Sequence, residues 1–195
     1  LDGMQTHRLI LEGLFGGLNK VISTKELIDK KTLAEFKINS IVLSYPEEEC
    51  KLVKGMKYQD EIDYIVTNTK RNEFIRDLTL NIKGNTLVLF QFVEKHGNIL
   101  HKMISEATDR KVFYVYGGTD TQTREDIRAI TEKQKDAIIV ASYGTFSTGI
   151  NIRNLHNIVF SSPSKSRIRT LQSIGRGLRR SDSKDSAILF DIADD

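Results

Sequence analysis

The sequence predicts a doubly wound α/β fold with a mostly parallel sheet. From Asn85 onward, short apolar runs of four to six residues alternate with helix-like stretches. The runs show no polar alternation, which is typical of strands that are covered by helices on both faces. Strands that alternate with helices in this way build a parallel sheet. The strand-like runs are TLVLF (86–90), KVFYVY (111–116), AIIVAS (137–142), NIVFSS (157–162) and AILFDI (187–192).

The intervening segments complete this pattern. Helices are predicted over 94–106, 121–133 and 165–174, where apolar residues recur at helical spacing. Upstream, NSIVLSY (39–45) is compatible with a further strand, and 57–82 is compatible with a long helix. Residues 1–36 contain a GLFGG turn signal, and their pattern does not predict any other element.

The composition is that of a globular domain. The chain has 195 residues, of which 39% are hydrophobic and 28% charged, and a net charge of +3, which argues against a disordered chain. No run approaches the roughly 18 apolar residues of a membrane-spanning helix, and the first residues lack the pattern of a signal peptide. The single cysteine, Cys50, can form neither an internal disulfide nor a zinc site. We therefore expect a cytoplasmic protein with no membrane partner and no structural metal.

Basic side chains are concentrated in one segment. Residues 161–184 carry seven lysines and arginines and one acid, Asp182, whereas residues 1–160 are close to neutral. A basic segment beside a neutral body is typical of a phosphate-binding site, on a nucleotide or on a nucleic acid. The alternative is a solvated helix face that binds no ligand.

The strongest local pattern, QSIGRGLRR (172–180), lies within this segment. On a helical wheel Gln172, Arg176 and Arg179 fall beside an apolar arc, so they would face away from the core. Two guanidinium groups at this spacing can clamp the charge that develops on a γ-phosphate. An arginine-rich surface helix without a ligand is the alternative, but it explains neither the glutamine nor the paired glycines.

Three other patterns follow predicted strands, at the edge where parallel sheets bind ligands. ASYGTFSTGINI (141–152) offers small hydroxyl and glycine donors for phosphates, including Ser142 and Thr145. In the same segment Gly149 permits a tight turn, and Asn151 offers an amide to a sugar hydroxyl. An ordinary polar loop is the alternative. The other two signals, YGGT (116–119) with Arg124 downstream and Gln91 after TLVLF, are weaker.

Two nucleotide-binding patterns are excluded. The sequence has no G-x-x-x-x-G-K-[ST] loop, so it cannot hold phosphates in the manner of a P-loop. Asp60-Glu61-Ile62-Asp63 spells D-E-x-D, but the residues before it do not form the buried strand that would carry a Mg²⁺-binding acid. We interpret these acids as the start of a helix, where they complement the helix dipole.

These motifs, in this order, resemble the C-terminal RecA-like lobe of superfamily 2 helicases. QSIGRGLRR is similar to motif VI (Q-x-x-G-R-x-x-R), ASYGTFSTGINI to motif V and LVLFQF to motif IV. The resemblance implies that residues 1–36 extend from a first lobe and that residues 37–195 form the helicase C-terminal domain. This sequence departs from the family pattern at two positions: Asn151, where many members have Asp, and Leu178, where many members have a small residue.

The resemblance also implies roles for individual residues. Arg176 and Arg179 would be the arginine fingers that reach ATP on the other lobe. The implied nucleotide-binding residues are Gly149, Asn151, Gln172, Arg176 and Arg179. The implied nucleic-acid-binding residues are Gln91, Gly117, Gly118, Ser142 and Thr145. ATP and Mg²⁺ would be held mainly by the first lobe, so this lobe alone would not hydrolyse ATP.

The function implied is that of the second motor lobe of an ATP-dependent DNA helicase or translocase. Resemblance to phage recombination helicases within the superfamily implies branched DNA, such as Holliday junctions and stalled forks, and RNA–DNA hybrids in R-loops as substrates. The setting would be recombination, repair and replication, in the host cytoplasm if a phage encodes the chain. Two alternatives are a nucleic-acid-binding module without motor activity and a lobe of a remodelling or restriction-type translocase.

Overall fold

The computed structural model describes residues 5–17, 19, 21–145, 152–163, 175, 184 and 186–195. The chain divides into two compact units, residues 1–33 and residues 34–195. The sequence placed the start of the main domain at residue 37, but Glu35 and Phe36 already belong to its first strand. No helix in the described ranges is long and apolar enough to cross a membrane.

The described residues of the first unit form the helices α1 (Gln5–Phe15) and α2 (Thr24–Asp29). Neither was predicted from the pattern. A capping box begins α2: the Ser23 hydroxyl accepts from the Glu26 backbone N–H, and the Glu26 carboxylate accepts from the Ser23 N–H. This reciprocal pair satisfies two backbone donors that a helix start otherwise leaves unpaired.

The second unit is built on a sheet whose described strands are all parallel, in the order β1-β6-β5-β2-β4-β3. The strands are β1 (Glu35–Leu43), β2 (Thr86–Phe90), β3 (Val112–Val115), β4 (Ile138–Ser142), β5 (Asn157–Phe160) and β6 (Ser186–Asp194). All five predicted runs from residue 86 onward are strands. The predicted strand 39–45 is displaced, since β1 begins at Glu35 and ends at Leu43 as it pairs with β6 along its whole length.

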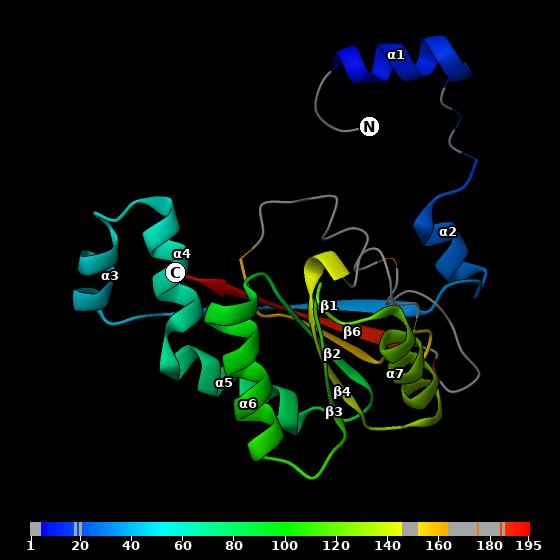
Figure 1. Cartoon of the computed structure of the whole chain (residues 1–195). Coiled ribbons are helices and arrows are strands. Elements are labelled where there is room, and N and C mark those ends of the chain that lie inside the picture. The colour runs from blue at the N-terminus through cyan, green and yellow to red at the C-terminus, as the bar shows by residue number, and fades with distance from the viewer. Residues whose placement is uncertain are drawn as a thin grey trace. The chain divides into compact units, whose positions relative to one another are not determined.

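Helices cover both faces of this sheet (Figure 1). On one face lie α5 (Thr69–Asn81) and α6 (Asn98–Glu106), and on the other lies α7 (Thr121–Lys133). Two shorter helices, α3 (Glu47–Val53) and α4 (Tyr58–Thr67), precede α5. The predicted helix 121–133 is confirmed, whereas the predicted helix 165–174 lies outside the described residues.

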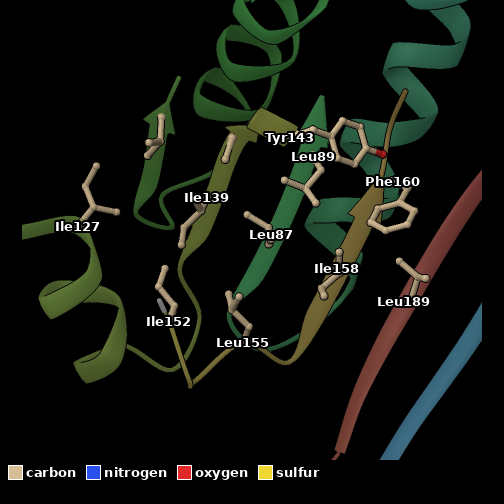
Figure 2. Packing of buried hydrophobic residues seen from close by; sticks show 12 residues of the cluster. Leu87, Leu89, Ile127, Ile139, Tyr143, Ile152, Leu155, Ile158, Phe160 and Leu189 are labelled. Atoms are coloured by element: carbon tan, nitrogen blue, oxygen red, sulfur yellow. The ribbon is translucent and has the colours of Figure 1, made fainter. Parts of the chain in front are cut away.

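The core consists of two layers because successive residues of a strand point to opposite faces. The layer beneath α7 includes Leu87, Leu89 and Ile139, which lie close together in Figure 2. The layer beneath α5 and α6 includes the alternate residues Val88 and Val140. Every residue of β2, β4 and β5 is buried, which explains why their sequences are mostly apolar.

The predicted long helix 57–82 is interrupted. Asn68 adopts an extended backbone between α4 and α5, and its side chain accepts from the Arg71 backbone N–H to cap α5. An asparagine that can cap a helix competes with helix continuation at that position. The predicted helix 94–106 likewise starts as a π-helical turn, η1 (Val93–Gly97), before α6.

A close contact explains the glycine at the end of η1. A Cβ atom at Gly97 would lie 2.5 Å from the ring of Phe90 and 2.7 Å from the hydroxyl of Tyr114. Only glycine lets this backbone approach the sheet so closely. The turn therefore packs directly on the end of β2.

Candidate functional site

Five of the predicted site residues lie in the described part of the chain, and they share one edge of the sheet. Gln91 follows β2, Gly117 and Gly118 follow β3, and Ser142 is the last residue of β4, with Thr145 just beyond it. Because β2, β4 and β3 are adjacent and parallel, their carboxyl ends meet at the same edge. The other five, Gly149, Asn151, Gln172, Arg176 and Arg179, lie outside the described residues.

The turn after β4 is closed by its own hydroxyl groups. The Ser142 and Thr145 hydroxyls lie 2.8 Å apart, and the Thr145 backbone N–H donates to the Ser142 hydroxyl over 3.3 Å. Both residues are buried. These hydroxyls therefore stabilise the turn itself.

The Gly117–Gly118 turn is exposed, and Arg124 stabilises it by hydrogen bonds to its carbonyl groups. The Arg124 Nη2 donates to the carbonyls of Tyr116 and Gly117 over 3.4 and 3.2 Å. The Thr119 hydroxyl accepts from the Tyr116 backbone N–H over 3.1 Å. Arg124 therefore has a structural role, and Gly117 and Gly118 are both exposed residues.

The D-E-x-D sequence lies at the start of a helix. Asp60 and Glu61 lie in the first turn of α4, as the sequence analysis proposed, and Asp63 forms an ion pair with Lys95 of η1. Within the described ranges, no group of three or more His, Cys, Asp or Glu side chains is arranged to hold a metal ion.

A buried ion pair at the same edge was not predicted. Arg71 of α5 and Asp194 of β6 form two hydrogen bonds, Nε to Oδ1 over 2.7 Å and Nη2 to Oδ2 over 3.0 Å. The Arg71 side chain is fully buried, and its Nη1 donates to the Ser161 carbonyl over 2.7 Å. The Tyr45 hydroxyl donates to the same carboxylate over 2.6 Å. Burial and this carboxylate raise the pKa of Tyr45, so its proton stays in place.

A second buried network lies beside the first and joins η1 to the end of β5. His96 is fully buried between Ser162 and Asn72, with its Nδ1 2.8 Å from the Ser162 hydroxyl and its Nε2 3.0 Å from the Asn72 Oδ1. The Ser162 hydroxyl also accepts from the Gln91 backbone N–H over 3.1 Å. Burial, followed by repulsion from Arg71, lowers the pKa of His96 to about 3. The imidazole is therefore neutral at physiological pH.

The neutral, buried His96 makes stability depend on pH. In the unfolded chain the imidazole has a pKa near 6.5, so the unfolded state binds more protons than the folded state between about pH 6.5 and pH 3. The stability is complete above that window and falls as the pH decreases through it, by at most about 1.4 kcal/mol per pH unit for one proton. We expect urea unfolding of His96→Gln to show a shallower loss of stability with acid than the wild type, with parallel behaviour above pH 7. Equal slopes in the window would contradict this assignment.

The sequence carried little signal for these two networks. Arg71 stands in a polar stretch, KRNEF, that is typical of an exposed helix, and its partner is far away in the sequence. His96 was included in a predicted helix without a role. The one signal in the sequence was Ser162, because the predicted strand 157–162 ends there and would place it at the carboxyl end of the parallel strands.

The fold and this edge define a class of protein. Residues 69–181 match the model of the helicase conserved C-terminal domain family, and the chain belongs to that family. The predicted identity as the C-terminal RecA-like lobe of a superfamily 2 helicase is confirmed.

One relative is a particular phage protein. The chain is 42% identical over 185 residues to the ATP-dependent DNA helicase UvsW of Enterobacteria phage T4, and the match covers 93% of this chain and 36% of that protein. It is 28% identical to the putative ATP-dependent helicase IRC3 of Saccharomyces cerevisiae, covering 86% of this chain and 24% of that protein. The chain thus spans about a third or less of the length of these curated relatives.

Solved structures agree on the fold. The crystal structure of T4 UvsW matches with a TM-score of 0.72 and 44% identity, covering 84% of this chain and 33% of that chain. A putative HsdR subunit of a type I restriction enzyme from Vibrio vulnificus matches with a TM-score of 0.73 at 17% identity, covering 97% of this chain and 38% of that chain. At this lower identity the second match shows the fold alone. The predicted RecA-like α/β fold is confirmed.

Proposed function

We propose that this chain is the second motor lobe of an ATP-dependent DNA helicase or translocase. ATP and Mg²⁺ would lie on a first lobe, and this lobe would supply Arg176 and Arg179 to the reacting phosphate. Residues 1–33 would connect the two lobes, and residues 34–195 would form the lobe itself. The membership of the helicase family and the similarity to a DNA helicase of phage T4 support this proposal.

The observation that carries the proposal is the shared edge of the sheet. The described candidates for DNA contact follow three adjacent strands, and the basic segment follows β5 in the same sheet. The exposed residues Gly117 and Gly118 suit contact with the phosphates of a nucleic-acid backbone, which proteins bind through Arg and Lys, polar side chains and backbone N–H groups. A grip on DNA at this edge, alternating with one on the first lobe, would move the strand as ATP is hydrolysed.

The substrates proposed are branched DNA molecules and R-loops, in recombination, repair and replication. We expect the complete motor, with this chain joined to its first lobe, to hydrolyse ATP faster with a synthetic four-way junction than with a linear duplex of the same total length. This chain alone should bind DNA weakly. It should not hydrolyse ATP, because its sequence has no P-loop, the motif that holds the β-phosphate. The measurement is steady-state phosphate release at fixed salt, since DNA binding is salt-dependent.

Each outcome of this experiment is informative. DNA binding without DNA-stimulated hydrolysis in the complete protein would favour the alternative of a nucleic-acid-binding module. Equal stimulation by linear and branched DNA would remove the proposed substrate preference and leave a translocase lobe of the remodelling or restriction type. Hydrolysis by this chain alone would contradict the division of labour between the lobes.

A further inference from the structure

Ser162 joins three segments of the lobe that are distant in the sequence. The residue is 3% exposed and lies just beyond β5, before Pro163 and the first lysine of the basic segment. The hydroxyl contacts the Gln91 backbone N–H after β2 and the His96 ring of η1. His96 in turn contacts Asn72 of α5, and Asn72 donates to the Val66 carbonyl of α4 over 2.9 Å.

One arrangement of protons satisfies this chain of hydrogen bonds. The Asn72 amide nitrogen donates to a carbonyl, so its Oδ1 faces His96 and requires a proton on the His96 Nε2. The neutral ring then accepts at Nδ1, so the Ser162 hydroxyl donates to it and accepts from the Gln91 N–H. Each of these buried groups has a partner, and a network that is fully satisfied in this way is rigid.

Attachment of β5 to the sheet does not require this network. The preceding residue, Ser161, already binds β2: both its backbone N–H and its hydroxyl donate to the Leu89 carbonyl, over 3.0 and 2.7 Å. Ser162 instead extends past the strands to the loop that begins at Gln91. That loop is a proposed DNA contact, and the residues after Ser162 lead to the proposed arginine fingers.

We propose that Ser162, held by His96 and Asn72, is a positioning residue that couples DNA contact at the Gln91 loop to the arginine-bearing segment. This inference rests on the proposed function, since it assigns how the two halves of that site communicate. A change in the backbone at Gln91 on DNA binding would be passed through a direct hydrogen bond to Ser162, which immediately precedes Pro163 and the basic run of the sequence.

The test uses two adjacent serines as a matched pair in the complete motor. Ser162→Ala removes the hydroxyl that contacts Gln91 and His96, whereas Ser161→Ala removes a buried hydroxyl that only binds β2. For each variant we would measure ATP turnover with and without a saturating four-way junction, together with the melting temperature. We expect Ser162→Ala to lower the ratio of stimulated to unstimulated turnover by about 3- to 10-fold, which lies within the range of coupling changes seen along such networks. Ser161→Ala should retain the wild-type ratio at a similar loss of stability.

A second pair tests the ring. His96→Gln keeps one donor and one acceptor and is expected to retain most of the coupling, whereas His96→Leu removes both and should lower the ratio as Ser162→Ala does. If the two serine variants change the ratio equally, or if neither changes it, Ser162 is only structural and the inference is wrong. A wild-type motor that DNA does not stimulate would instead refute the proposed function itself, before any variant is compared.

Discussion

Replacing Arg176 or Arg179 by alanine is expected to lower DNA-stimulated ATP turnover of the complete motor by at least ~10²-fold. Arginine fingers act on the charge that develops as the phosphoryl group transfers, and they contribute on the order of 10³–10⁵ in rate where they have been dissected. Because the interaction is strongest in the transition state, kcat should fall much more than ATP affinity. Turnover at saturating ATP and equilibrium binding of a fluorescent ATP analogue would measure the two separately.

Arg180 offers a matched control for these variants. It lies in the same basic run but outside the spacing that the family motif assigns to the fingers. Arg180→Ala removes one positive charge as the other two variants do, so it reports the general effect of charge on DNA binding. If all three variants were equally active, or equally impaired, the assignment of the fingers to Arg176 and Arg179 would be wrong.

The fold was predictable because the hydrophobic pattern of each central strand reflects its burial in the sheet. The strands β2, β4 and β5 are buried on both faces, so their continuous apolar runs marked them directly. The edge strand β1 was placed only in part, because much of it is exposed and its sequence, EFKINSIVL, mixes polar and apolar residues. The break at Asn68 was missed because its cap depends on one side chain, whereas the flanking segments are both helical in pattern.

The candidate site was predictable only to the level of the sheet edge. The positions of Gln91, Gly117, Gly118, Ser142 and Thr145 after strands were sufficient to bring them together, since parallel strands end at one edge. Which of their polar groups are already used inside the fold could not be predicted, because the partners of Ser142 and Gly117 are set by turn geometry. The buried networks of Arg71 and His96 depend on contacts across the whole sequence, for which local pattern gives no signal.

Replacing Arg71 by methionine is expected to lower the free energy of unfolding of this chain by about 3–5 kcal/mol. Removal of one partner leaves the Asp194 carboxylate buried and without its counter-charge, which costs far more than the net value of the pair. The Ser161 carbonyl loses its donor in the same variant. Since a domain is stable by only about 5–15 kcal/mol, the loss would be a large part of the total. Urea unfolding followed by circular dichroism would measure it.

Two further variants separate the burial of the pair from the loss of charge. Arg76 lies on the same helix and pairs with Asp77 at the surface, so Arg76→Met removes an equal charge from an exposed ion pair, and its effect should be much smaller. Adding Asp194→Leu to Arg71→Met removes the stranded carboxylate and should restore part of the stability, because apolar residues can replace a buried ion pair at little cost. If Arg71→Met were as mild as Arg76→Met, the pair would not be buried in solution. The anchoring of Ser161 by Arg71 of α5 would then need another explanation.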